Sequence, residues 1–162
     1  LGVLAAAYGL FWLALAGLVA NRLADGLDGE VARLAGPTDR GAFLDIALDF
    51  LFYALFPVGF AIADPATNAL PAVVLVASFV GTGSSFLAFS IIAERRGLTS
   101  EDYPSKGIFY LGGLTEGAET IGLFVLICLL PGLFPVLALV FAAACFVTTL
   151  TRWLTGWRLF GA

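Results

Sequence analysis

Three long stretches of the chain contain no charged residue, and this feature limits most strongly the folds that the chain can adopt. They cover residues 1–20, 69–93 and 132–151 of the 162-residue sequence. Because an α-helix rises about 1.5 Å per residue, roughly 20 apolar residues cross the hydrocarbon core of a bilayer. Two further stretches, 42–63 and 107–131, are equally apolar except for two carboxylates each. The sequence therefore predicts five membrane-spanning helices.

Other structural classes fit these stretches poorly. The apolar stretches are about twice as long as the strands of a membrane β-barrel, and their apolar and polar residues do not alternate with a period of two. Residues 1–20 lack the basic start and the cleavage site of a signal peptide, so we expect them to form a true span. Breaks between helices are expected at Gly36-Pro37, Asp64-Pro65 and Pro131. The expected fold is an all-α, polytopic membrane bundle, with residues 1–162 forming a single domain.

The charged residues exclude one class of partner and indicate an orientation. The sequence pI is about 4.5, and no basic patch mixed with aromatic residues points to nucleic-acid binding. If five helices alternate across the bilayer, all eight basic residues fall on one side, which the positive-inside rule makes cytoplasmic. This places Leu1 on the opposite side, so one further upstream helix, six spans in all, is expected in a parent protein. The basic residues are Arg22, Arg33, Arg40, Arg95, Arg96, Lys106, Arg152 and Arg158.

Four aspartates flank the first expected connection. Asp25 and Asp28 are three residues apart, and Asp45 and Asp49 are four apart, so on helices each pair shares one face. Two antiparallel helices joined by a short loop can point all four carboxylates into one space. Carboxylates gathered in this way repel one another and lose hydration, and bound cations would offset this cost.

Two divalent cations would cancel the formal charge of these aspartates. Ligands that are all oxygen favour Mg²⁺, Mn²⁺ or Ca²⁺ over zinc, and two such ions about 4 Å apart suit in-line displacement at phosphorus. Gly29 and Ala32 are small enough for a ligand to approach the backbone, and Arg33 suits phosphate oxygens. The alternatives are a divalent-metal-binding transporter and a non-catalytic membrane partner. A cation pathway, however, has no use for an arginine beside its carboxylates.

The stretch from residue 25 to residue 49 resembles the signature of the CDP-alcohol phosphatidyltransferases. It reads DGLDGEVARLAGPTDRGAFLDIALD, and the signature is D-x2-D-G-x2-A-R-x(7 or 8)-G-x3-D-x3-D. All eight fixed positions are filled, with seven residues between Arg33 and Gly41. The eight are Asp25, Asp28, Gly29, Ala32, Arg33, Gly41, Asp45 and Asp49.

The resemblance implies a six-helix membrane enzyme, usually a homodimer, that acts in phospholipid biosynthesis. We expect it in a prokaryotic inner (plasma) membrane, with the active site on the cytoplasmic side. An alcohol would attack the phosphorus that bears the lipid in CDP-diacylglycerol or another CDP-alcohol, and CMP would leave. Asp49 would act as the general base. The resemblance assigns two cations, Mg²⁺ or Mn²⁺, to Asp25, Asp28, Asp45 and Asp49, and the CDP moiety to Gly29, Ala32, Arg33, Thr38 and Gly41.

The acceptor alcohol is not specified by the signature. Glu116 and Glu119 lie inside the fourth expected span, where they either help select the acceptor or pair with Arg or Thr of a neighbouring helix. Lys106 either binds a phosphorylated acceptor or only satisfies the positive-inside rule. Glycerol phosphate, inositol phosphate, serine and another phosphatidyl lipid are all open as acceptors, and the donor could instead be a CDP-linked polar head group.

Overall fold

The structure is a computed structural model that describes residues 1–36, 38–98 and 115–161, with the backbone alone at Asp25 and residues 27–35. Within these ranges the chain is helical and contains no strand. The elements in chain order are α1 (Gly2–Ala7), α2 (Phe11–Ala35), α3 (Asp39–Ala63), α4 (Pro65–Arg95), α5 (Gly117–Leu129), the 3₁₀ helix η1 (Pro131–Leu133) and α6 (Phe134–Phe160).

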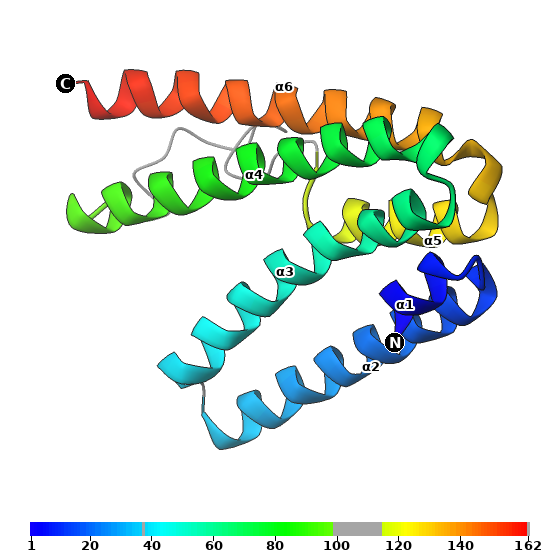
Figure 1. Cartoon of the computed structure of the whole chain (residues 1–162). Helices are drawn as coiled ribbons and strands as arrows, with labels where there is room; N and C mark the ends of the chain where they lie inside the picture. Colours follow the sequence, from blue (N-terminus) through cyan, green and yellow to red (C-terminus); the bar gives the residue numbers. More distant parts are fainter. Residues whose placement is uncertain (37, 99–114, 162) are drawn as a thin grey trace.

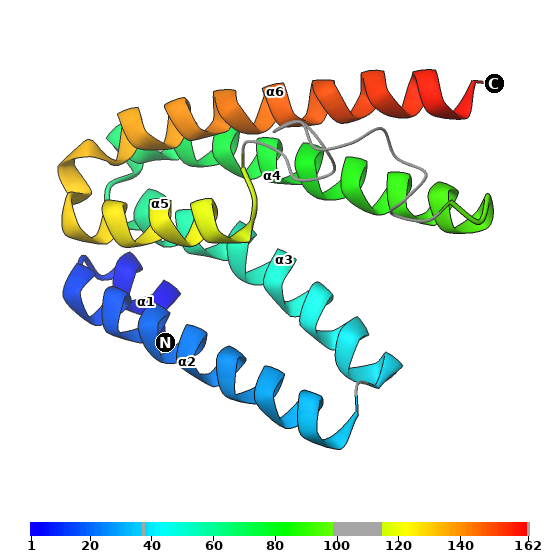
Figure 2. The same cartoon turned by 180° about the vertical axis from the view of Figure 1, so that it is seen from behind.

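The long helices run antiparallel to their neighbours in the sequence. Figure 1 shows the turns between α1 and α2, between α3 and α4, and between α5 and α6 at one end of the molecule. The α2–α3 turn and the C-terminal ends of α4 and α6 lie toward the other end. The view from behind in Figure 2 confirms that α4 and α6 lie side by side, while α3 diverges from α4 beyond their shared turn.

Three helical segments of the described chain are long and apolar enough to cross a membrane. They are α3, α4 and the continuous stretch Pro131–Phe160. The apolar part of α2, Phe11–Ala24, and α5 are shorter. The prediction of an all-α membrane bundle is confirmed, whereas the count of five full spans is not.

Residues 1–20 do not form the single span that their uniform hydropathy predicts. Helix α1 ends at Ala7 and the chain reverses through Gly9, whose φ of 73° is left-handed. The Gly9 N–H donates to the Ala6 carbonyl at 2.9 Å and the Leu10 N–H to the Ala5 carbonyl at 2.8 Å. These two bonds make a Schellman motif, which satisfies the backbone at the reversal without any charged residue. The prediction was wrong because hydropathy does not detect such a turn.

The packing of α1 against α3 depends on a missing side chain at Gly59. A Cβ there would lie 2.7 Å from the Val3 carbonyl oxygen and 2.9 Å from the Ala6 Cβ. We therefore expect Gly59→Ala to lower the free energy of unfolding in detergent by about 1–3 kcal/mol, since the two helices must separate. Gly122→Ala is the matched control, because a Cβ at this α5 position meets no atom within 4 Å. Equal stability of the two variants would contradict the α1–α3 packing.

Proline marks two of the helix boundaries that the sequence predicted, whereas Pro37, at the third predicted break, lies outside the described residues. Asp64 ends α3 and begins α4: its carboxylate accepts from the Thr67 N–H at 3.3 Å, and Pro65 occupies the first turn. Pro131 opens η1, which leads directly into α6. Helix α6 then continues to Phe160, nine residues beyond the expected end at 151. Arg152 therefore lies inside a helix rather than after one.

Two arginines join α4 to α6. The Arg152 Nη1 donates to the Thr82 carbonyl at 3.0 Å. The Arg96 guanidinium donates to the Leu159 carbonyl at 3.3 Å and to the Phe160 carbonyl at 2.7 Å, and lies 5.5 Å from the Phe160 ring centre. Arg96 thereby satisfies carbonyl groups that the last turn of α6 cannot pair itself.

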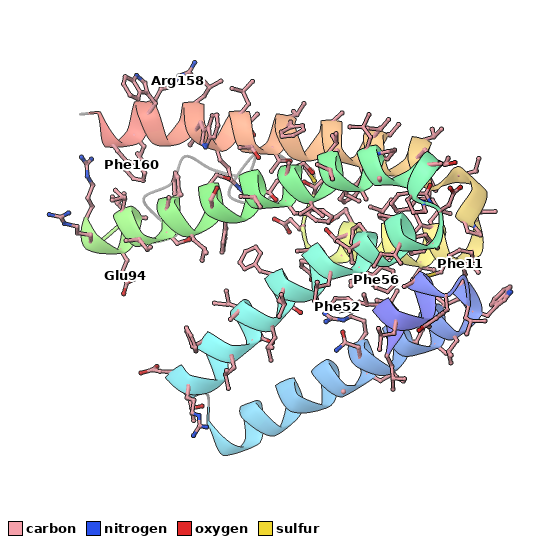
Figure 3. All side chains as sticks on the ribbon, in the orientation of Figure 1. Phe11, Phe52, Phe56, Glu94, Arg158 and Phe160 are labelled. Carbon is pink, nitrogen blue, oxygen red and sulfur yellow. The ribbon has the colours of Figure 1, made fainter. Side chains whose placement is uncertain are left out.

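An aromatic core fixes α3 against α5 and α6. Phe56 stacks on Phe124 with ring centres 4.6 Å apart, and Phe60 stacks on Phe134 at 5.0 Å. All four rings are fully buried. Figure 3 shows Phe52 and Phe56 on the stretch of α3 that approaches α1 and α5. This core sets the position of the α3 turns that precede it, including those that carry Asp45 and Asp49.

Candidate active site

A cavity of about 400 Å³ lies between α3, α4, the start of α5 and α6. Four charged residues contribute to its walls: Asp45 and Asp49 from α3, Glu116 at the start of α5, and Arg152 from α6. Much of the remaining lining is aromatic or small, including Phe50, Tyr53, Phe79, Thr82, Gly83 and Phe86. Ionisable groups are costly to place among apolar helices, so the convergence of four of them on one cavity indicates a functional site.

Asp45 and Asp49 lie one helical turn apart and both reach the cavity, as their spacing predicts. Asp49 accepts a hydrogen bond through each of its two carboxylate oxygens. One of its oxygens, Oδ1, accepts from Arg22 Nη2 at 3.0 Å, and the other, Oδ2, accepts from the Tyr53 hydroxyl at 3.4 Å. The Asp49 carboxylate is therefore held between α2 and the cavity.

The other half of the predicted aspartate cluster lies on α2. Asp25 and Asp28 fall within the last three turns of this helix, which is antiparallel to α3 and joined to it through residues 36–38. Gly29, Ala32 and Arg33 follow on the same helix. Of these five residues the structure describes the backbone, so their roles toward metal and CDP remain predictions.

Thr38 and Gly41 form the start of α3. The Thr38 side chain caps the helix by accepting from the Gly41 N–H at 3.1 Å. A Cβ on Gly41 would lie 3.0 Å from the Thr38 Oγ1, so glycine keeps this turn tight. The predicted contact of Thr38 with CDP is compatible with capping, because the hydroxyl can still donate its own hydrogen.

Glu116 and Glu119 do not lie in the middle of a span, which corrects the sequence prediction. Helix α5 begins at Gly117, with Glu116 as its N-cap. The Glu119 carboxylate accepts from the Glu116 N–H at 3.0 Å. A helix N-terminus stabilises negative charge, which explains why these carboxylates are tolerated there. Only Glu116 of the pair lines the cavity. Lys106, the third predicted acceptor residue, lies outside the described residues.

From the sequence, Arg22 and Arg152 were used only to predict the orientation of the chain in the membrane. Arg22 lies inside α2 rather than in a loop and pairs with Asp49. Arg152 lines the cavity, as Glu116 does, and lies 5.5 Å from the Phe86 ring centre. The available signal was that each arginine lies within two residues of the end of an uncharged apolar stretch that could continue as helix.

The carboxylates of Asp45 and Asp49 are suited to bind divalent cations. Asp45 and Asp49 supply carboxylate oxygens from one helix face, the donor type that Mg²⁺ and Mn²⁺ prefer. Among the side chains that the structure describes, no group of three metal-binding residues occurs. Asp25 and Asp28, the other two aspartates of the predicted metal-binding set, lie on α2.

Comparison with known proteins identifies the family. A family model described as CDP-alcohol phosphatidyltransferase matches residues 1–157, nearly the whole chain. The chain belongs to the CDP-alcohol phosphatidyltransferase family. The family resemblance drawn from residues 25–49 is thus confirmed. Membership in this family supports phosphatidyl transfer in phospholipid synthesis, with a CDP-alcohol substrate and a general dependence on divalent metal.

The similarity of the chain to a curated protein bears on its location in the cell. The chain is 52% identical over 160 residues to the inner membrane protein YnjF of Escherichia coli (strain K12). The similar region covers 97% of this chain and 78% of that protein. Together with the membrane-spanning helices, this similarity supports an inner-membrane location. No solved structure matches the chain.

Proposed function

We propose that this protein transfers a phosphatidyl group from a CDP-linked lipid to an alcohol, with release of CMP. The proposal rests on one observation above all: two aspartates of the family signature, Asp45 and Asp49, share a cavity with Glu116 and Arg152. Acid and base chemistry needs a carboxylate within reach of the acceptor hydroxyl, and phosphate recognition needs nearby positive charge.

Asp49 is the proposed general base. The acceptor oxygen forms a new bond to the phosphorus that bears the lipid, the bond from this phosphorus to CMP breaks, and the acceptor proton moves to the Asp49 carboxylate. Two divalent cations, Mg²⁺ or Mn²⁺, would neutralise the phosphate oxygens and the charge developing on CMP when bound. We assign their binding to Asp25, Asp28, Asp45 and Asp49, and CDP binding to Gly29, Ala32, Arg33, Thr38 and Gly41.

The acceptor's polar end is proposed to lie at the opposite wall. Glu116 and Arg152 supply one negative and one positive charge there. Glu119 is engaged in the helix cap, so acceptor selection within the pair falls to Glu116. We also propose that the site faces the cytoplasm, since the basic helix ends lie toward the α2–α3 turn, and that the enzyme is a homodimer like other members of its family.

The test is CMP release by the purified full chain in detergent with CDP-diacylglycerol and Mg²⁺. The acceptor panel contains glycerol phosphate, inositol phosphate, serine and a phosphatidyl lipid, each with and without EDTA, and a parallel series uses a CDP-linked head group as donor. We expect CMP release that depends on metal and on one acceptor. Tight binding of divalent ions without CMP release from any pair would instead favour a transporter or an ion-binding protein.

A substitution at Glu116 tests the acceptor assignment. Glu116→Gln keeps the size of the side chain but removes its charge, so we expect the KM for the acceptor to rise about tenfold while the KM for the CDP-lipid stays nearly constant. Steady-state kinetics with each substrate varied in turn would separate the two effects. Glu94→Gln, at the exposed end of α4, is the matched control. A rise confined to the CDP-lipid KM would place Glu116 at the donor instead.

A further inference from the structure

Arg22 makes the one ion pair that the structure describes at the proposed catalytic base. We propose that Arg22 is a positioning residue and counter-ion for Asp49, so that its ion pair and divalent cations compete for this carboxylate. The inference rests on the proposed function, because it concerns the same aspartate. It extends that function by assigning a role to a residue that lies outside the family signature, one helical turn before Asp25.

Three of the contacts of the Arg22 side chain lie within the part of the chain that the structure describes. Its Nη2 donates to the Asp49 Oδ1 at 3.0 Å and to the Asn21 Oδ1 at 2.9 Å. The guanidinium carbon lies 5.8 Å from the centre of the Phe52 ring, which Figure 3 shows on α3, so the cation is also placed over an aromatic face. Because Asn21 and the Phe52 ring already hold this long side chain, it loses little further freedom when it pairs with Asp49.

The ion pair is partly withdrawn from solvent. The exposed fractions of the two side chains are 23% for Arg22 and 31% for Asp49. An arginine keeps its charge at any physiological pH, so it can neutralise Asp49 whenever no metal is bound. Removing one partner of a shielded pair leaves the other charge without its compensation. Arg22 therefore balances the charge of Asp49 across the α2–α3 interface.

A divalent cation at Asp49 would approach the same carboxylate that Arg22 contacts. The guanidinium and the cation then repel each other at short range, which weakens cation binding or displaces the arginine. Asp49 has lone pairs beyond those used by Arg22 and Tyr53, so a cation can still reach it. Arg22 is thus expected to lower the affinity for cations while it holds Asp49 in place.

The test measures Mn²⁺ binding alone, without nucleotide, by calorimetry on the full chain in detergent. We expect Arg22→Gln to bind Mn²⁺ on the order of tenfold more tightly than the unchanged protein, and Arg22→Lys to remain close to it because the charge is kept. Tyr53→Phe is the matched control: it removes the uncharged hydrogen bond to Asp49 and should leave the Mn²⁺ affinity within about twofold.

Thermal unfolding gives a second readout that does not depend on activity. Metal-free Arg22→Gln should melt at a lower temperature than the unchanged protein, and saturating Mn²⁺ should raise its Tm by a larger amount. Equal or weaker Mn²⁺ affinity in Arg22→Gln, with normal metal-dependent CMP release in the unchanged protein, overturns the inference and spares the proposed function. Absence of both Mn²⁺ binding and CMP release from the unchanged protein overturns both.

Discussion

Asp49→Asn is expected to slow CMP release by about 10²- to 10⁴-fold, the range over which general-base catalysis contributes. The amide cannot take the acceptor proton, but its oxygen can still accept from Arg22 and its size is unchanged. The loss should therefore appear in kcat rather than in the KM for either substrate. Initial rates at saturating CDP-lipid, acceptor and Mg²⁺ provide the measurement.

Asp64→Asn is the control for this substitution. Asp64 caps α4 at the opposite end of the helices, and asparagine is an equally good N-cap, so both the fold and the rate should be preserved. Unfolding curves of the two variants would show that the rate loss at Asp49 does not reflect misfolding. Normal turnover by Asp49→Asn would assign the base to another group.

Phe124→Ala is expected to lower the free energy of unfolding by about 3–5 kcal/mol, the usual cost of removing a buried aromatic ring. Phe124 is fully buried and its ring contacts those of Phe56, Tyr53 and Phe79. Its loss opens a space at the junction of α3, α4 and α5. Denaturant or thermal unfolding in detergent would measure the change.

Phe43→Ala on α3 is the matched control, because it removes the same ring from a position that is 69% exposed. We expect a change of less than about 1 kcal/mol there. Similar losses at both positions would mean that the aromatic core does not determine the stability of the bundle. A loss confined to Phe124 would also predict indirect damage to the site, since Asp49 lies on the α3 turns that this core fixes.

Features that depend on residues close together in the sequence were predicted correctly. Asp64-Pro65 breaks the chain between α3 and α4 because the carboxylate caps and proline cannot continue the preceding helix. The four-residue spacing of Asp45 and Asp49 placed both carboxylates on one wall because an α-helix repeats every 3.6 residues. The family signature, which is also local, was confirmed over nearly the whole chain.

What the sequence did not predict depends on contacts between distant segments. The reversal at Gly9 lies in an unbroken apolar run, and the absence of a Cβ at Gly59, fifty residues away, is what admits α1 against α3. The pairing of Arg22 with Asp49 joins two helices, and nothing in either local sequence specifies it. Glu116 was placed in mid-span because hydropathy averages over the start of α5, where the helix dipole tolerates a carboxylate.

The hydrogen bonds that Arg96 and Arg152 make between α4 and α6 limit which wall of the cavity can move. Thr82 lies on α4 and Arg96 caps its C-terminal end fourteen residues later, a distance of about 21 Å along a helix. Sliding α4 along α6 by one turn would break the bonds at both levels together, so these helices resist shear and act as a fixed frame. Within the described chain, the α2–α3 hairpin, whose free end diverges from that frame, can move without breaking these bonds.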